Sequence, residues 1–180
     1  KQRDAVLATD GPVLIIAGAG SGKTKALTHR IAYLIQEKNV MPWNILAVTF
    51  TNKAATEMKH RIEKLFSEGT KEMPTVGTFH SVCAQILRRH IHLLGYENSF
   101  VIYDTNDQVV LMKQIMKDRH ISEKEINPKA VLGHISQAKN QLMTAEQYGV
   151  QSHNYFTEKV GELYGPYQNR LAKNQALDFD

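Results

Sequence analysis

Apolar residues in the first hundred positions alternate between short continuous runs and helical stripes. Short runs at 13–17, 45–50 and 75–79 predict three buried strands. After each run, apolar residues recur every three or four positions, which predicts three helices. These helices are expected over 23–38, from 52 to about 66, and from the end of the third run to about 94. This repeated order of strand and helix is typical of an α/β fold with a parallel sheet and crossover helices.

The alternation ends near residue 103. Residues 100–103 predict one more short strand, and from 104 onward the spacing predicts only helices, over about 105–120, 128–142 and 154–173. Proline at the first turn of the second of these helices favours a start at Asn127-Pro128. Gly165-Pro166 interrupts the third stripe, and an internal proline removes a helical hydrogen bond. We therefore expect a kink there, or a break into two helices.

A glycine-rich segment, AGAGSGKT at 17–24, joins the first predicted strand to the first predicted helix. The backbone N–H groups of such a turn, together with the positive end of the helix, form a site for one anion. Lys23 is placed to reach the β- and γ-phosphates of a nucleotide, and the Thr24 hydroxyl is placed to ligate Mg²⁺. We therefore expect a nucleoside triphosphate with Mg²⁺, and the alternative is a glycine-rich turn with a surface lysine. The strict motif begins with glycine where this chain has Ala17, which serves if its φ is negative.

Charge and composition narrow the partners and the compartment. Residues 1–90 carry 13 Lys and Arg against 7 Asp and Glu, a net charge of +6, whereas residues 91–180 carry 9 against 11, a net charge of −2. The basic first half fits a polyanionic partner besides the nucleotide, or only a solvated face. No apolar stretch approaches the roughly 20 residues of a membrane helix. Cys83 is alone and has apolar neighbours, so we expect a buried thiol in a reducing, cytoplasmic compartment.

Blocks of sequence follow one another in a specific order along nearly the whole chain. In that order the chain resembles the N-terminal part of superfamily I DNA helicases of the UvrD, PcrA and Rep type. TFTNKAA, within the second long block, is more specific than the phosphate loop. The blocks are Gln2 with Ala5-Val6, AGAGSGKTKALTHRIAYLI at 17–35, ILAVTFTNKAATEMKHRI at 45–62, GTFHS at 77–81, ILRRH at 86–90, IYD at 102–104, DQ at 107–108, ISQAKN at 135–140 and LDFD at 177–180.

The resemblance extends the nucleotide site beyond the loop. Gln2 matches the adenine-reading glutamine of the family, since an amide can pair with adenine N6 and N7; the alternative is an exposed N-terminal glutamine. Lys25 stands where family members commonly have arginine, which keeps the charge but not the planar fork. Lys23 and Thr24 are the expected catalytic residues. The expected nucleotide contacts are Gln2, Ala17, Gly18, Ala19, Gly20, Ser21, Gly22, Lys23, Thr24 and Lys25.

The ends of the second and third predicted strands carry the expected DNA contacts. Ligands of open α/β sheets bind at the carboxyl ends of the strands. The resemblance implies single-stranded DNA there, with Phe50 near a base, Thr51 and Asn52 near phosphates, and Thr78 and His80 at the backbone. An aromatic face stacks on any base, which suits binding without sequence preference. The alternatives are that Phe50 is a core residue, that Thr51 and Asn52 only cap a helix, and that His80 is structural.

The resemblance also implies an organisation and an activity. It implies a RecA-like ATP-binding subdomain over 1–103, a helical insertion over 104–175 and the start of a return to the first subdomain over 176–180, in a piece of a longer protein. The implied activity is an ATP-dependent helicase that moves 3′ to 5′ along single-stranded DNA towards a junction with duplex. The alternative is a non-catalytic module for nucleotide and single strands. A P-loop kinase or unrelated ATPase ranks third, because TFTNKAA and GTFHS argue against it.

Asp178 and Asp180 resemble Mg²⁺-binding acids but are not expected to have that role. Such a carboxylate ends a buried apolar strand, whereas the polar residues 173–175 precede this segment. The family places LDFD upstream of its Asp-Glu pair, so we expect that pair and the arginine fingers to lie outside this chain.

Overall fold

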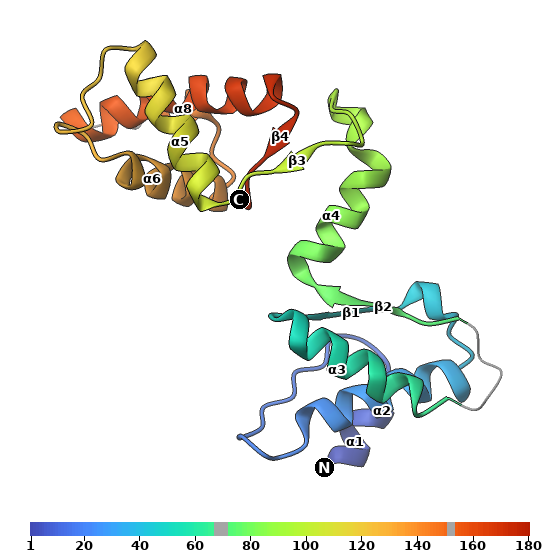
Figure 1. Ribbon diagram of the computed structural model, residues 1–180. Helices are drawn as coiled ribbons and strands as arrows, with labels where there is room; N and C mark the ends of the chain where they lie inside the picture. Colours follow the sequence, from blue (N-terminus) through green and yellow to red (C-terminus); the bar gives the residue numbers. More distant parts are fainter. Residues whose placement is uncertain (67–71, 151–153) are drawn as a thin grey trace. The chain divides into compact units, whose positions relative to one another are not determined.

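The computed structural model describes residues 1–66, 72–150 and 154–180, which form two compact units, Lys1–Ile86 and Leu87–Asp180. Figure 1 shows that helices dominate, with two short sheets of two parallel strands each. The prediction of a mixed α/β chain is therefore confirmed. The domain boundaries expected after residues 103 and 175 stay predictions.

The first unit packs helices against a parallel pair of strands. Strand β1 (Leu46–Thr49) pairs with β2 (Thr75–Thr78), so that Leu46 lies opposite Thr75 and Thr49 opposite Thr78. Its core joins one residue of α2, one of β1 and two of α3, namely Ile31, Ala47, Met58 and Ile62. The other elements are α1 (Gln2–Leu7), α2 (Lys23–Gln36), a 3₁₀ helix (Pro42–Asn44) and α3 (Asn52–Glu63). Helix α4 (Phe79–His90) begins directly after β2 and runs past Ile86, the last residue of this unit.

The buried strand expected at 13–17 is wrong for this structure. The segment has no strand hydrogen bonding, and Leu14 and Ile16 are 85% and 89% exposed. A strand needs a neighbour for its backbone groups. Within the described residues of this unit, β1 and β2 pair only with each other. The apolar residues of this run favour burial in a sheet, but no described segment pairs with the run, so it does not form a strand.

The burial expected for Cys83 is also wrong, because its side chain is exposed. Val82, its neighbour on α4, is buried, whereas Ile86 one turn later is exposed. Helical spacing identifies the apolar face of a helix but does not say whether another element covers it.

The second unit is a helical cluster with a two-residue parallel strand pair. Helices α5 (Thr105–Asp118), α6 (Pro128–Asn140) and α8 (Tyr155–Lys173) share one core, and α7 (Ala145–Val150) packs on α8. Strand β3 (Val101–Ile102) pairs with β4 (Ala176–Leu177). The core includes Met112, Met116, Val131, Ile135, Val160, Leu163 and Tyr167. All the secondary structure described between 105 and 175 is helical, as predicted. No helix among the described residues is long and apolar enough to cross a membrane.

Local signals set the helix starts of this unit. Asp104 and Asp107 form a capping box at α5, Asn154 and Thr157 form another at α8, and α6 begins with an Asn127 cap followed by proline. Of the kink or break expected at Gly165-Pro166, the break into two helices is wrong, because α8 continues through Pro166 as one helix. The buried stripe of α8 extends on both sides of the proline and holds the helix together.

Candidate nucleotide and nucleic-acid sites

The glycine-rich loop leads directly into α2, whose N-cap is Gly22. Gly20 and Gly22 have φ values of 73° and 83°, a left-handed conformation that side chains disfavour. A Cβ on Gly22 would also lie 2.6 Å from the side-chain nitrogen of Gln2. The backbone turn therefore favours glycine at position 22, and a side chain there would also displace the amide of Gln2.

Lys23, the first residue of α2, folds back over the loop. Its Nζ donates to the carbonyl oxygens of Ala17 and Gly18 at 2.8 and 2.7 Å. The Ser21 hydroxyl donates to the same Gly18 oxygen at 2.6 Å. The ammonium thus lies within the turn, beside the start of a 14-residue helix whose first N–H groups and dipole favour an anion. Thr24 follows on the exposed first turn.

The structure brings Gln2 to this loop from the start of the chain. The Gln2 amide donates to the Ser21 carbonyl oxygen at 2.6 Å, and α1 is tied to α2 by Arg30, which donates to the Ala5 carbonyl oxygen at 2.7 Å. Beside this contact lies a cavity of about 260 Å³. It is lined by Gln2, Arg3, Val6, Lys25, Ala26 and His29. Gln2 and Lys25, both expected nucleotide contacts, therefore face one cavity next to the phosphate loop.

A pair of aromatic side chains stands at the carboxyl ends of the two strands. Phe50 follows β1 and Phe79 follows β2, and their ring centroids are 5.8 Å apart at an interplanar angle of 49°. Phe50 is 93% exposed and Phe79 is 49% exposed. Phe50 is therefore not a core residue in this unit. His80 and Asn52 are exposed near the same strand ends.

Two of the expected DNA contacts also cap helices. The Thr51 hydroxyl accepts from the Ala54 N–H at 3.2 Å, at the N-cap of α3. Thr78 is 8% exposed, and its hydroxyl accepts from the Ser81 N–H at 3.2 Å. The Ser81 hydroxyl in turn lies 2.9 Å from both the backbone nitrogen and the carbonyl oxygen of Thr78. These bonds fix the turn from β2 into α4 and hold Phe79 in place.

Sequence reasoning missed three side chains that lie with the expected residues. Phe79 lies within GTFHS, and its position after a strand parallel to the one before Phe50 is a signal that could have identified it. Arg3 and His29 line the cavity beside Gln2. His29 lies one helical turn after Lys25, a spacing that places both on one face of α2.

Asp178, which we did not expect to bind Mg²⁺, is bonded to two side chains of α6 and α8. Its carboxylate pairs with the Lys139 ammonium at 2.5 Å and accepts from the Tyr167 hydroxyl at 3.1 Å. Burial, and then the negative charge of Asp178, raise the pKa of Tyr167, so the phenol stays protonated and donates. The ISQAKN and LDFD blocks are therefore joined, a link strengthened by Ser136, which donates to Asp180 at 2.6 Å.

Comparisons with known proteins place this chain among helicase sequences. The family described as UvrD/REP helicase N-terminal domain matches residues 1–180. The chain is similar to the ATP-dependent DNA helicase PcrA of Bacillus subtilis (strain 168), with 51% identity over 179 residues, 99% of this chain and 24% of that protein. It is 47% and 48% identical over 180 residues to the proteins of the same name from Staphylococcus aureus (strain NCTC 8325 / PS 47) and Leuconostoc citreum. Each of those matches also covers the whole chain and 24% of the relative, so the chain spans about a quarter of their length.

Proposed function

This chain belongs to the UvrD/REP helicase family as its N-terminal domain, and we propose that it is the ATP-binding and single-strand-binding part of a DNA helicase. Its first unit is then the beginning of a RecA-like subdomain, and the helices between 104 and 175 are an insertion into it. The observation that carries the proposal is that one unit holds both the Gly22–Lys23 loop with Gln2 beside it and the exposed Phe50–Phe79 pair.

ATP is the proposed ligand of the loop. Its phosphates fit against the start of α2, with Lys23 exchanging two carbonyl partners for phosphate oxygens. The adenine fits the cavity that Gln2 and Lys25 line, where the Gln2 amide can turn from the Ser21 carbonyl to the base edge. Bound through the Thr24 hydroxyl and the phosphates, Mg²⁺ would neutralise charge that develops during phosphoryl transfer.

Single-stranded DNA is the proposed ligand of the strand ends. A base can stack on the exposed face of Phe50, which Phe79 supports from the side. The exposed Asn52 and the start of α3 offer donors to a phosphate, as does the exposed ring of His80. Thr51 and Thr78 act mainly by fixing the two turns, since their hydroxyls already serve as caps.

Coupling of the two ligands gives the proposed activity. The helix that binds phosphate and the strand ends that bind DNA belong to one small core, so a shift of α2 on ATP binding is passed to β1 through Ile31 and Ala47. In the complete protein, the proposed result is movement 3′ to 5′ along single-stranded DNA and opening of a junction with duplex. The water-activating acid pair and the charge-stabilising arginines are proposed to lie in the remaining length that the relatives have.

The proposal is tested with one substitution that should weaken nucleotide binding and leave single-strand binding unchanged. Lys23→Ala should weaken binding of a fluorescent ATP analogue by at least about tenfold, because it removes a charge-assisted contact to phosphate. Binding of a labelled oligothymidine, measured by fluorescence anisotropy at fixed salt, should stay within about twofold. Lys38→Ala, an exposed lysine beyond the end of α2, is the matched control. Loss of oligothymidine binding with unchanged nucleotide binding would contradict the assignment of the loop.

A further inference from the structure

The cavity beside the phosphate loop lies between two helices, and one of them, α1, is held without a buried core. The cavity is lined by Gln2, Arg3 and Val6 of α1 and by Lys25, Ala26 and His29 of α2. No residue of α1 is buried. A helix of six residues is also too short to be stable by itself. The cavity therefore depends on other contacts that hold α1 against α2.

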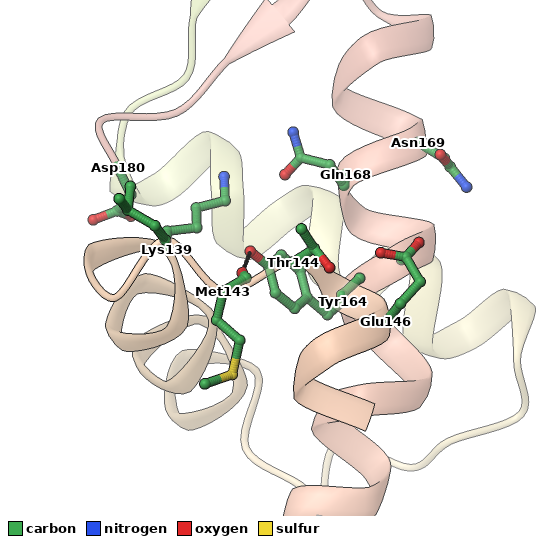
Figure 2. Close-up of a pocket in the computed structure, with 11 residues that line it drawn as sticks. Lys139, Met143, Thr144, Glu146, Tyr164, Gln168, Asn169 and Asp180 are labelled. Atoms are coloured by element: carbon green, nitrogen blue, oxygen red, sulfur yellow. Dashed lines mark hydrogen bonds between the residues drawn. The ribbon is translucent and has the colours of Figure 1, made fainter. Parts of the chain in front are cut away.

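A cavity in the second unit shows the contrast (Figure 2). It has a volume of about 510 Å³ and lies between the end of α6, the start of α7 and the middle of α8. Tyr164 of α8 forms part of its wall and is 4% exposed, because it belongs to the hydrophobic core of that unit. Burial of large side chains fixes the walls of that cavity, whereas α1 has no such anchor.

Two hydrogen bonds join α1 to the rest of its unit in the part of the chain that the structure describes. The Gln2 amide donates to the Ser21 carbonyl oxygen at 2.6 Å, and Arg30 Nη1 donates to the Ala5 carbonyl oxygen at 2.7 Å. Ala5 lies in the last turn of α1, where carbonyl oxygens lack helical donors and the helix dipole favours a cation. The half-buried guanidinium of Arg30 therefore supplies a charge-assisted bond at the end of α1 that suits its charge.

Binding of a base would leave Arg30 as the polar anchor of α1. In the proposed function, the Gln2 amide turns from the Ser21 carbonyl oxygen to the edge of adenine, so the first of the two bonds is given up. The bond from Arg30 to Ala5 does not compete with the base, because Arg30 is not among the residues that line the cavity. The position of Gln2 against the base then depends on a residue that the base does not reach.

We propose that Arg30 is a positioning residue for base recognition, because it holds α1 where Gln2 can read adenine. The inference rests on the proposed function, in which ATP occupies the loop and the cavity. Helix α2 then serves both parts of the nucleotide. Lys23 at its start binds the phosphates, and Arg30, about two turns later, determines which base is accepted. Loss of the Arg30 guanidinium should remove the preference for adenine and leave phosphate binding intact.

The first arm of the test compares ATP, GTP and inorganic tripolyphosphate, which has no base, on this 180-residue chain. Affinities are measured with Mg²⁺ by titration calorimetry. The unchanged chain should prefer ATP to GTP about tenfold, as expected for an amide that pairs with adenine. Arg30→Met keeps the aliphatic stem and should reduce this preference to about twofold or less, while the tripolyphosphate affinity stays within about twofold. Arg119→Met, at an exposed arginine beyond the end of α5, is the matched control and should keep the preference.

The outcomes separate this inference from the proposed function. If the unchanged chain binds no nucleotide, or binds ATP and GTP equally, recognition of adenine by Gln2 is wrong and the inference is overturned with it. If the unchanged chain prefers ATP and Arg30→Met keeps that preference, the inference alone is overturned. An equal loss of affinity for all three ligands assigns Arg30 to the fold of the unit and overturns its role in base recognition.

The second arm tests whether Arg30 acts through Gln2. Gln2→Ala should remove the preference for ATP by itself, and adding Arg30→Met should change the ratio of the two affinities no further. Additive effects of the two substitutions on that ratio would contradict a positioning role. Arg30→Lys keeps a charged donor and should retain more of the preference than Arg30→Met, and it carries the test if Arg30→Met does not fold. Loss of the whole preference in a folded Arg30→Lys, with tripolyphosphate binding reduced in parallel, also overturns the proposal.

Discussion

The Phe50 ring is 93% exposed, so substituting Phe50 distinguishes a contact with DNA from a role in packing. Phe50→Ala should weaken binding of a single strand by about 1–3 kcal/mol, the range for loss of one base–aromatic stack. The free energy of unfolding should change by no more than about 0.5 kcal/mol, as for other surface substitutions. Oligothymidine affinity at fixed salt and the melting temperature of the same preparation are measured together.

The control for this change is Trp43→Ala, which removes another exposed aromatic ring, from the 3₁₀ helix before β1. It should leave oligothymidine affinity unchanged. The proposed role of Phe50 fails if Phe50→Ala leaves affinity intact and lowers stability by the roughly 3–5 kcal/mol typical of a truncated core phenylalanine.

Single residues differ in how far sequence determines their role. Lys23 could be placed from the loop motif alone, because the turn and helix that follow are local. Whether Phe50 was buried could not be predicted, since a phenylalanine after a strand is equally compatible with a core and a surface. We expect Thr78 to contact DNA, and its hydroxyl also caps α4, a second role that depends on the position of Ser81 after folding. Burial of Cys83 could not be predicted either, because it requires another element to cover that face of α4, and no described element does so.

An ion pair and a hydrogen bond hold α6, α8 and the segment after β4 together. Asp178 pairs with Lys139 and accepts a hydrogen bond from the Tyr167 hydroxyl. Asp178→Ala should lower the free energy of unfolding of the second unit by about 3–5 kcal/mol, because it leaves the Lys139 ammonium in a site where little water reaches it. Urea denaturation followed by circular dichroism measures the loss. Adding Lys139→Met should recover part of it, since the double variant leaves no unpaired charge.

Glu158→Ala, at an exposed acidic position on α8, serves as the control and should change stability by about 0.5 kcal/mol or less. If Asp178→Ala costs no more than that control, the pair contributes nothing to the link between the helices and β4.

At the scale of elements, long periodic patterns were predictable and short or interrupted ones were not. Helices α2, α3, α5 and α6 follow from apolar spacing and caps, and the parallel pairing of β1 with β2 follows from the alternation of strand and helix. Helix α7 has six residues, too few to establish a period. Pro166 is tolerated because packing against α5 and α6 outweighs the lost hydrogen bond, a balance that local sequence does not contain.

The whole chain should bind ATP but hydrolyse it at close to the background rate. Loss of a charge-stabilising arginine alone can cost about 10³–10⁵ in the rate of phosphoryl transfer. Steady-state phosphate release is measured with and without oligothymidine, and nucleotide binding by the same sample shows that the site is formed. Turnover at ordinary enzyme rates with DNA stimulation would show that the chain already holds a complete active site.

The exposed segment at 13–16 is expected to promote aggregation of the chain. Val, Leu and Ile in succession form an apolar run with high β-propensity, and no described strand pairs with it. Such a run is a template for edge-to-edge pairing between copies, the first step of ordered aggregation. These four exposed residues thus give copies of this chain a segment through which they can pair. A polar substitution in these four residues next to the phosphate loop is therefore expected to raise the concentration at which the chain stays monomeric.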